Sequence, residues 1–198
     1  SGEQSYSHLF AVFPITVSAT QWITYNPRLR TLADLAGRRV NLGPPGSASA
    51  QYGQYTLEAA GVWERVQKEF VNWSQGVRLM QDGIVDAVTV TGPPPFPAVQ
   101  EAAAVYGKRL YFVELGTAAI EGVIRRNPSL QPQVVQPDVY GPGIPAEPYR
   151  SVGYLAVLAA TDAAPSDAVY EMLKALLTPD GRRYLINSIS VFEAGFAT

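Results

Sequence analysis

The chain alternates short β-branched or aromatic stretches with helix-length stretches, and glycine or proline separates most of them. Residues 39–42 predict a strand that enters a Gly/Pro turn, and residues 49–60 predict the helix that follows it, ended by Gly61. The order repeats in a further helix at 74–81, strands at 85–91 and 109–115, and helices from 97 and at 117–126. Such alternation is typical of an α/β fold with a mainly parallel sheet.

The two ends of the chain carry weaker signals. Residues 9–25 are rich in β-branched and aromatic side chains, and Pro14 predicts a break between two strands there. Near the other end we expect a strand at 151–160, a helix at 165–177 and a last helix from about Pro179. The Pro/Gly-rich residues 128–148 show no regular period and predict a long ordered crossing.

Composition excludes several kinds of chemistry. The 198 residues are 47% hydrophobic and 16% charged, with a net charge of −2, which argues against nucleic acid as a partner. The chain has no cysteine and one histidine, His8, so thiolate, disulfide and thiolate-zinc chemistry are excluded and no catalytic constellation stands out. We expect no enzyme activity, metal or cofactor. The strongest apolar run, 154–160, is too short to span a membrane.

The turn after the strand at 39–42 is the sharpest motif. Residues 43–49 superficially match a nucleotide-binding P-loop, but Ala48 and Ser49 stand where that motif needs glycine and lysine. A glycine turn at a helix start still offers free N–H groups and the positive end of the helix dipole, beside the hydroxyls of Ser47 and Ser49. We expect either a site for a carboxylate or a simple helix cap.

Residues 31–49 resemble the signature segment of the TAXI solute receptors, which are the substrate-binding proteins of one branch of TRAP transporters. Weaker likenesses follow in the same order along the chain, at residues 80–88, 91–94, 140–153 and 165–176. The resemblance implies a periplasmic-binding-protein-like (type II) fold of two lobes that closes on a small carboxylate, glutamate-like or a dicarboxylate. It also implies a periplasmic or extracytoplasmic location and delivery to a membrane permease, although no signal peptide is visible in the sequence.

The resemblance also implies where the ligand binds. The Gly-Ser-Gly-Thr tetrad of the family corresponds to Gly46, Ser47, Ala48 and Ser49, and Ala48 departs from the pattern, because a Cβ there restricts φ or crowds the ligand. Further candidates are Thr91 and Gly92, at the carboxyl end of a strand where open α/β sheets bind ligands, together with Tyr140 and Phe13. The arginines at 78, 125, 126 and 150 are weaker candidates for a second carboxylate contact.

Set against this family, we expect the first lobe to lack its N-terminal part in this sequence. We expect residues 26–150 to form a central lobe, and residues 1–25 and 151–198 to form a reduced second lobe. Self-association and a missing N-terminal segment are both compatible with that reduced lobe. Two other functions stay open: the ligand-sensing domain of a regulator, and an α/β enzyme that uses carboxylates such as Asp86 or Glu114.

Overall fold

A computed structural model describes residues 7–188, with side chains up to residue 185, and it divides into two compact units. The larger unit is Ser18–Tyr154, and the described part of the smaller unit is residues 7–17 and 155–188. These boundaries differ from those expected at residues 26 and 151. Residues 18–25 belong to the larger unit because they form a central strand of its sheet.

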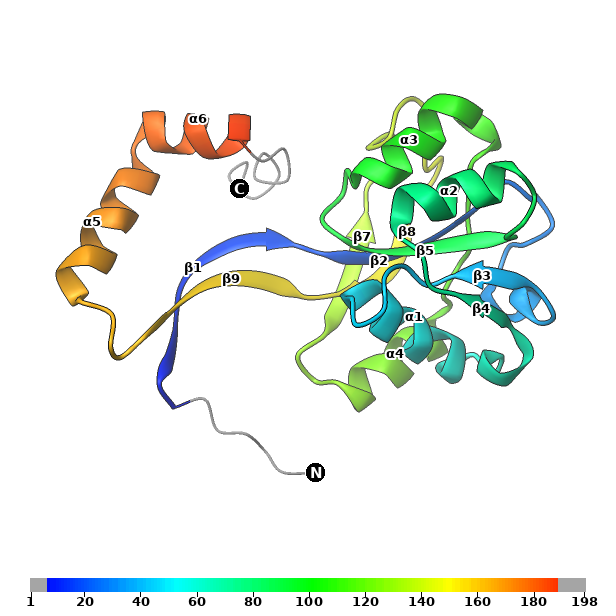
Figure 1. The fold of residues 1–198 in the computed structure, drawn as a ribbon, viewed down its shortest axis with the longest axis horizontal. Helices are drawn as coiled ribbons and strands as arrows, with labels where there is room; N and C mark the ends of the chain where they lie inside the picture. The colour runs from blue at the N-terminus through cyan, green and yellow to red at the C-terminus, as the bar shows by residue number, and fades with distance from the viewer. Residues whose placement is uncertain (1–6, 189–198) are drawn as a thin grey trace. The chain divides into compact units, whose positions relative to one another are not determined.

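The larger unit is built on a five-stranded sheet with the strand order β4-β3-β5-β2-β6 (Figure 1). The strands are β2 (Ala19–Thr24), β3 (Arg39–Asn41), β4 (Gln67–Glu69), β5 (Ala87–Gly92) and β6 (Tyr111–Phe112). β3 pairs in parallel with β4 and β5, whereas β2 pairs antiparallel with β5 and β6. Four strands therefore run in one direction, as the mainly parallel prediction requires, and β2 runs against them.

Helices cover both faces of this sheet. Figure 1 shows α2 (Trp73–Gln81) and α3 (Pro97–Tyr106) on one face, and α1 (Ala48–Ala59) and α4 (Thr117–Arg126) on the other. The α1 start has Ser47 as its N-cap, and α3 begins with a proline, which fits a first helical position. Within residues 7–188, no helix is both long and apolar enough to cross a membrane.

The hydrophobic core lies entirely in the larger unit. Every buried hydrophobic residue that the structure describes falls between Ala19 and Val152. Trp22 of β2 is fully buried, and its indole Nε1–H donates a hydrogen bond of 3.1 Å to the Thr56 hydroxyl of α1. The polar edge of the indole is thereby satisfied, so the ring can fill the space between sheet and helix.

The first predicted strand breaks at Ser18 and not at Pro14. β1 (Leu9–Val17) continues through Pro14, where the register shifts between Pro14 and Thr16, because such an irregularity tolerates a residue without an N–H group. The Ser18 N–H instead donates to the Tyr154 carbonyl. The strand predicted at 151–160 divides at Tyr154 into β8 (Tyr149–Gly153) and β9 (Leu155–Thr161).

Three short strands also differ from prediction. β7 (Gln131–Val135) pairs antiparallel with β8 inside the segment expected to be irregular. β4 has three residues and carries Gln, Lys and Glu, so no alternation marks it. β6 keeps only two of the residues predicted at 109–115, because Glu114 leaves β2 to bridge Thr31. Each depends on a partner distant in sequence, which local pattern does not reveal.

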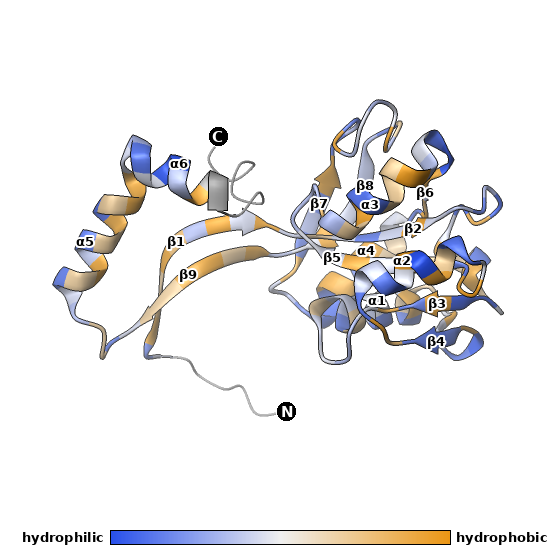
Figure 2. Ribbon diagram, turned by 45° about the horizontal axis from the view of Figure 1, so that its top comes forward, coloured by the Kyte–Doolittle hydropathy of each residue, from blue (hydrophilic) through white to orange (hydrophobic). Residues whose placement is uncertain are grey.

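The smaller unit has no comparable core. β1 and β9 form an antiparallel ribbon, followed by α5 (Ser166–Leu177) and α6 (Pro179–Ser188). Figure 2 shows apolar residues along both strands of the ribbon, yet Phe10 is 55% exposed and Leu155 46% exposed. No hydrophobic residue among those described in this unit is buried. A two-stranded ribbon with so little buried apolar surface is marginally stable by itself.

We predict that backbone amides of β1 and β9 exchange with deuterium at least about tenfold faster than those of β2 and β5. The β2 and β5 amides belong to strands that are buried along their whole length, whereas the ribbon opens without exposing a core. Hydrogen-exchange mass spectrometry of the intact chain measures both rates. Equal protection of the two regions would contradict the assignment of stability to the larger unit.

Candidate functional site

The ends of two strands and the beginning of a third meet at one edge of the five-stranded sheet. β3 and β5 both end there, and β2, which runs the opposite way, begins there. The register places Ala19 opposite Gly92 and Thr20 opposite Thr91. We call the group of residues 43–49, Thr91, Gly92 and Thr20, some exposed and some buried, the strand-end site. It lies where α/β sheets commonly bind ligands.

The turn between β3 and α1 needs glycine at two places. Gly43 has a φ of +81° and Gly46 a φ of +75°, a region that residues with a Cβ rarely occupy. At Gly43 a Cβ would also lie 2.7 Å from Nε1 of Trp73. These conformations direct the chain from the strand end into the first turn of α1.

Ser47 caps the helix and keeps a donor for a ligand. Its Oγ accepts the Ala50 N–H at 3.2 Å, so its own O–H remains available to donate. In the described chain no backbone acceptor faces the N–H groups of Ala48 and Ser49, as is usual in a first helical turn. Ala48 is the first residue of α1, so its Cβ imposes no φ strain there.

Ser49 has a different position from Ser47. Its side chain is fully buried, and its Oγ accepts the Thr91 N–H at 2.7 Å and the Trp73 Nε1–H at 3.0 Å. This one hydroxyl joins the start of α1 to the end of β5 and to the start of α2. Ser49 therefore fixes the geometry of the strand-end site from beneath its surface.

Threonine hydroxyls line the next part of the edge. The Oγ1 atoms of Thr20 and Thr91 lie 3.0 Å apart, and Thr91 is 6% exposed. Ser151 of β8 donates its hydroxyl to the Thr20 carbonyl. A hydroxyl pair can reorient its protons toward an acceptor. None of the residues of the strand-end site is ionisable, so its favourable potential for an anion comes from the N-terminus of α1.

Tyr140 and Gly92 shape the turn that follows β5. The Tyr140 hydroxyl donates to Gln21 Oε1 at 2.6 Å and accepts the Phe96 N–H at 3.0 Å. A Cβ at Gly92 would lie 2.5 Å from the Phe96 ring, which in turn meets Trp73 edge-on at 5.4 Å. Both hydrogen-bonding functions of the Tyr140 hydroxyl are thus used inside the protein, and Tyr140 supports the turn.

The comparison with protein families matches residues 1–183 to the NMT1-like family. The chain belongs to that family.

Solved structures show which fold this NMT1-like chain has. An ancestral arginine-binding protein bound to arginine matches 98% of the chain with 15% identity and a TM-score of 0.50, and the chain covers 65% of it. An amino acid ABC transporter substrate-binding protein from Streptococcus pneumoniae, AbpA, bound to L-arginine, matches 100% of the chain with 15% identity and a TM-score of 0.49, over 67% of its length. The match to the ancestral arginine-binding protein shows a mixed α/β fold of the periplasmic-binding-protein class.

A third match concerns a different ligand class. The periplasmic aliphatic sulphonate binding protein SsuA from Escherichia coli matches 53% of the NMT1-like chain with 21% identity and a TM-score of 0.41, and the chain covers 33% of it. All three solved proteins are named as binding proteins. The NMT1-like chain spans about two thirds or less of the length of each.

The structure brings together most of the predicted site residues. Gly46, Ser47, Ala48, Ser49, Thr91 and Gly92 share the strand-end site, and Tyr140 reaches its turn through Phe96. Phe13 lies on β1 in the smaller unit.

The carboxylates considered for an enzyme lie elsewhere. Asp86 precedes β5, and its Oδ2 accepts the Arg39 N–H at 3.0 Å; this is the end of β5 opposite Thr91. Among residues 7–188, no group of histidine and acidic side chains could hold a metal ion. His8 lies in the smaller unit, where its Nδ1 is 2.6 Å from Oδ2 of Asp162.

Two buried amides escape sequence reasoning. Asn41 Oδ1 accepts the N–H groups of Gly43 and Val71, so it positions the turn that leaves β3. Its Nδ2 faces Gly76, where a Cβ would lie 2.0 Å away. Gln21 Oε1 accepts a hydrogen bond from the Tyr140 hydroxyl. In the sequence each is one of several polar residues in a predicted strand, and such residues also occur on solvent-facing strands.

We predict that Ser49→Ala lowers the free energy of unfolding by about 1–3 kcal/mol, because it leaves the buried Thr91 N–H and the Trp73 indole N–H without an acceptor. Urea unfolding followed by fluorescence measures the loss. Ser129→Ala, at an exposed position, is the matched control and should change stability by less than about 0.5 kcal/mol. Equal stability of the two variants would remove the central role given to Ser49.

Stability should also fall at alkaline pH. Burial raises the pKa of Tyr25 to about 12 and also raises the pKa of Tyr140 and of Tyr149. Unfolded tyrosines lose their protons from about pH 10. The contribution of each buried tyrosine to the free energy of unfolding is therefore complete below that pH, and it declines by up to about 1.4 kcal/mol per pH unit above it.

Urea unfolding between about pH 9 and pH 11 measures this slope. Tyr140→Phe should make the slope shallower. Tyr184→Phe, at a side chain that is 71% exposed, should leave it unchanged. A slope that neither variant alters would mean that Tyr140 is not a source of the alkaline instability.

Proposed function

We propose that this chain is part of an extracytoplasmic solute-binding receptor that holds a small carboxylate, glutamate-like or a dicarboxylate, at the strand-end site. The observation that carries this proposal is the start of α1. The Ser47 hydroxyl and the N–H groups of Ala48 and Ser49 all offer protons there, beside the Thr20 and Thr91 hydroxyls, with no ionisable group among the residues of the site. Such an arrangement favours a carboxylate over a cation.

The absence of a charged partner in the strand-end site agrees with binding and release. A carboxylate held by neutral donors gains hydrogen bonds without forming a buried ion pair, so it can leave again. The strand-end site has hydrogen-bond donors, but among the described residues no general base, activated nucleophile or metal-binding cluster lies beside them. We therefore assign the site to binding without chemistry.

The choice of permease rests on sequence. Residues 31–49 resemble the signature of TAXI receptors, which supports a TRAP-type permease as the partner and a periplasmic location. The solved proteins of this fold include receptors of ABC transporters. The ligand class proposed here is compatible with either kind of transporter.

The second lobe of this receptor would include the smaller unit. Four large apolar side chains of its ribbon and of α5 are between 42% and 55% exposed: Phe10, Leu155, Val157 and Leu177. This exposure supports the idea that further polypeptide covers them. We propose that a preceding segment of the receptor supplies that cover. A second copy of the chain is the alternative, and a dimer in light scattering that persists at low protein concentration would favour it.

We predict that isothermal titration calorimetry detects one carboxylate among glutamate, glutamine and C4 to C6 dicarboxylates. Ser47→Ala should weaken its binding by about tenfold, because a hydrogen bond to a charged group is worth about 1.5–3 kcal/mol. The same variant should cost about 1 kcal/mol of stability through loss of the cap.

Ser129→Ala serves as the control and should bind like the unaltered chain. A circular-dichroism melt of each variant separates weaker binding from unfolding. The proposal fails if no compound of the panel binds, or if Ser47→Ala binds as tightly as the control.

A further inference from the structure

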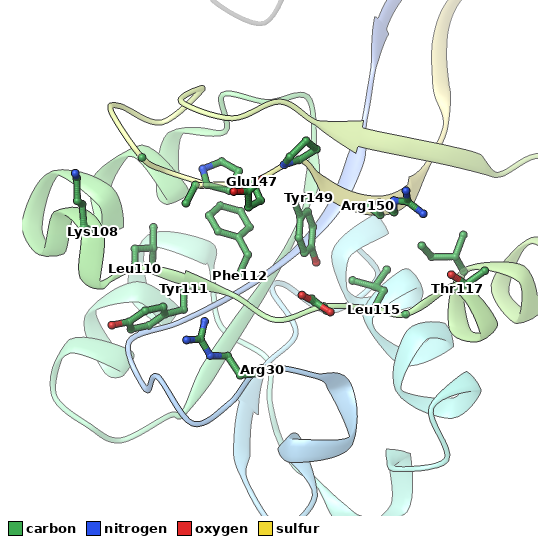
Figure 3. A pocket seen from close by; sticks show the side chains of 17 residues that line it. Arg30, Lys108, Leu110, Tyr111, Phe112, Leu115, Thr117, Glu147, Tyr149 and Arg150 are labelled. Atoms are coloured by element: carbon green, nitrogen blue, oxygen red, sulfur yellow. The ribbon is translucent and has the colours of Figure 1, made fainter.

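A cavity lies within the larger unit, outside the strand-end site. Its volume is about 550 Å³, and it opens between β6, the start of α4 and the loop of residues 143–148 (Figure 3). That volume is within the range of small-molecule pockets in proteins. We call it the β6 pocket.

Aromatic and aliphatic side chains form the walls of the β6 pocket. Phe112 and Tyr149 stand 5.1 Å apart between ring centroids, and the buried Leu110, Leu115 and Ile120 lie beside them. The Tyr149 hydroxyl donates to the Val113 carbonyl and accepts the Trp22 N–H. Because its polar end is fully used inside the protein, Tyr149 offers the pocket an apolar face.

Charges of both signs surround these apolar walls. Arg30, Lys108 and Arg150 line the pocket together with Glu114 and Glu147. Figure 3 labels all of these residues except Glu114. The Arg30 guanidinium lies over the Tyr111 ring, 5.1 Å from its centroid. Within residues 7–188, none of the five forms an ion pair. Cationic and anionic groups are thus both available to a ligand.

The β6 pocket and the strand-end site share no residue. Tyr111 of the pocket pairs with Thr24 at the end of β2, whereas Thr91 and Gly92 pair with Thr20 and Ala19 at its beginning. The two sites therefore lie toward opposite ends of the same strand, and a ligand in one leaves the other open.

We propose that the β6 pocket binds a free amino acid with an aromatic or large apolar side chain. The ammonium group faces Glu114 and Glu147, the carboxylate faces the arginines, and the side chain rests on Phe112 and Tyr149. A compound with only a carboxylate meets two uncompensated acidic groups, and one with only an amine meets three basic groups. A zwitterion matches both sets.

The test uses three related compounds: L-phenylalanine, 3-phenylpropionate without the amine, and phenethylamine without the carboxylate. Backbone glycine signals in a ¹H–¹⁵N correlation spectrum of this chain report each site separately. Gly116 and Gly143 line the β6 pocket, and Gly46 and Gly92 belong to the strand-end site. L-Phenylalanine should shift the first pair saturably, with at least about tenfold tighter binding than either analogue.

Variants of the acidic groups provide a matched comparison. The double substitution Glu114→Gln with Glu147→Gln should weaken L-phenylalanine binding at least about tenfold and strengthen 3-phenylpropionate binding. A structural defect would weaken both. Glu121→Gln, an exposed position on α4 outside the pocket, should change neither.

Three results would overturn the proposal. They are an absence of shifts at Gly116 and Gly143 up to about 10 mM phenylalanine, equal binding of 3-phenylpropionate by the unaltered chain, and no effect of the double substitution. Shifts confined to Gly46 and Gly92 are a case of the first result, and they would support the strand-end site. Loss of carboxylate binding at the strand-end site alone would leave the β6 pocket standing.

Discussion

The geometry of the larger unit depends on one buried hydroxyl. Ser49 Oγ accepts hydrogen bonds from the Thr91 backbone and from the Trp73 indole, so three elements that are far apart in sequence meet at a single atom. A buried donor without an acceptor is costly, and the arrangement therefore holds α1 in one register against the end of β5. The free N–H groups at the start of α1 are directed by the same contact. Support beneath the surface and hydrogen-bond donation at the surface are divided between Ser49 and Ser47.

Much of this architecture follows from sequence. The turn at residues 43–49 has glycines, a serine cap and a following helical pattern, all of which act locally, and the structure places α1 within one residue of its predicted start. The resemblance to solute receptors likewise led to the fold class. Short-range contacts of the same kind occur at Thr31, whose N–H donates to Asp34 Oδ2 at 2.8 Å.

Long-range contacts account for what the sequence did not reveal. β7 exists because β8 pairs with it, and β2 joins the larger unit because β5 and β6 flank it. Tyr140 carries no sign in the sequence that its hydroxyl contacts Gln21, 119 residues earlier. The β6 pocket likewise gathers residues from Arg30 to Arg150, and no local spacing links them. In this chain, short-range chemistry predicts turns and helix starts, and pairing between distant segments determines strand boundaries.

The two ends of the larger unit meet at one hydrogen bond, from the Ser18 N–H to the Tyr154 carbonyl. A Cβ at the neighbouring Gly153 would lie 1.7 Å from the Ser18 carbonyl oxygen, so the two crossing strands touch backbone to backbone. In topological terms, Ser18–Tyr154 is an insertion whose entry and exit coincide. Such a module can be exchanged between related chains at this single place.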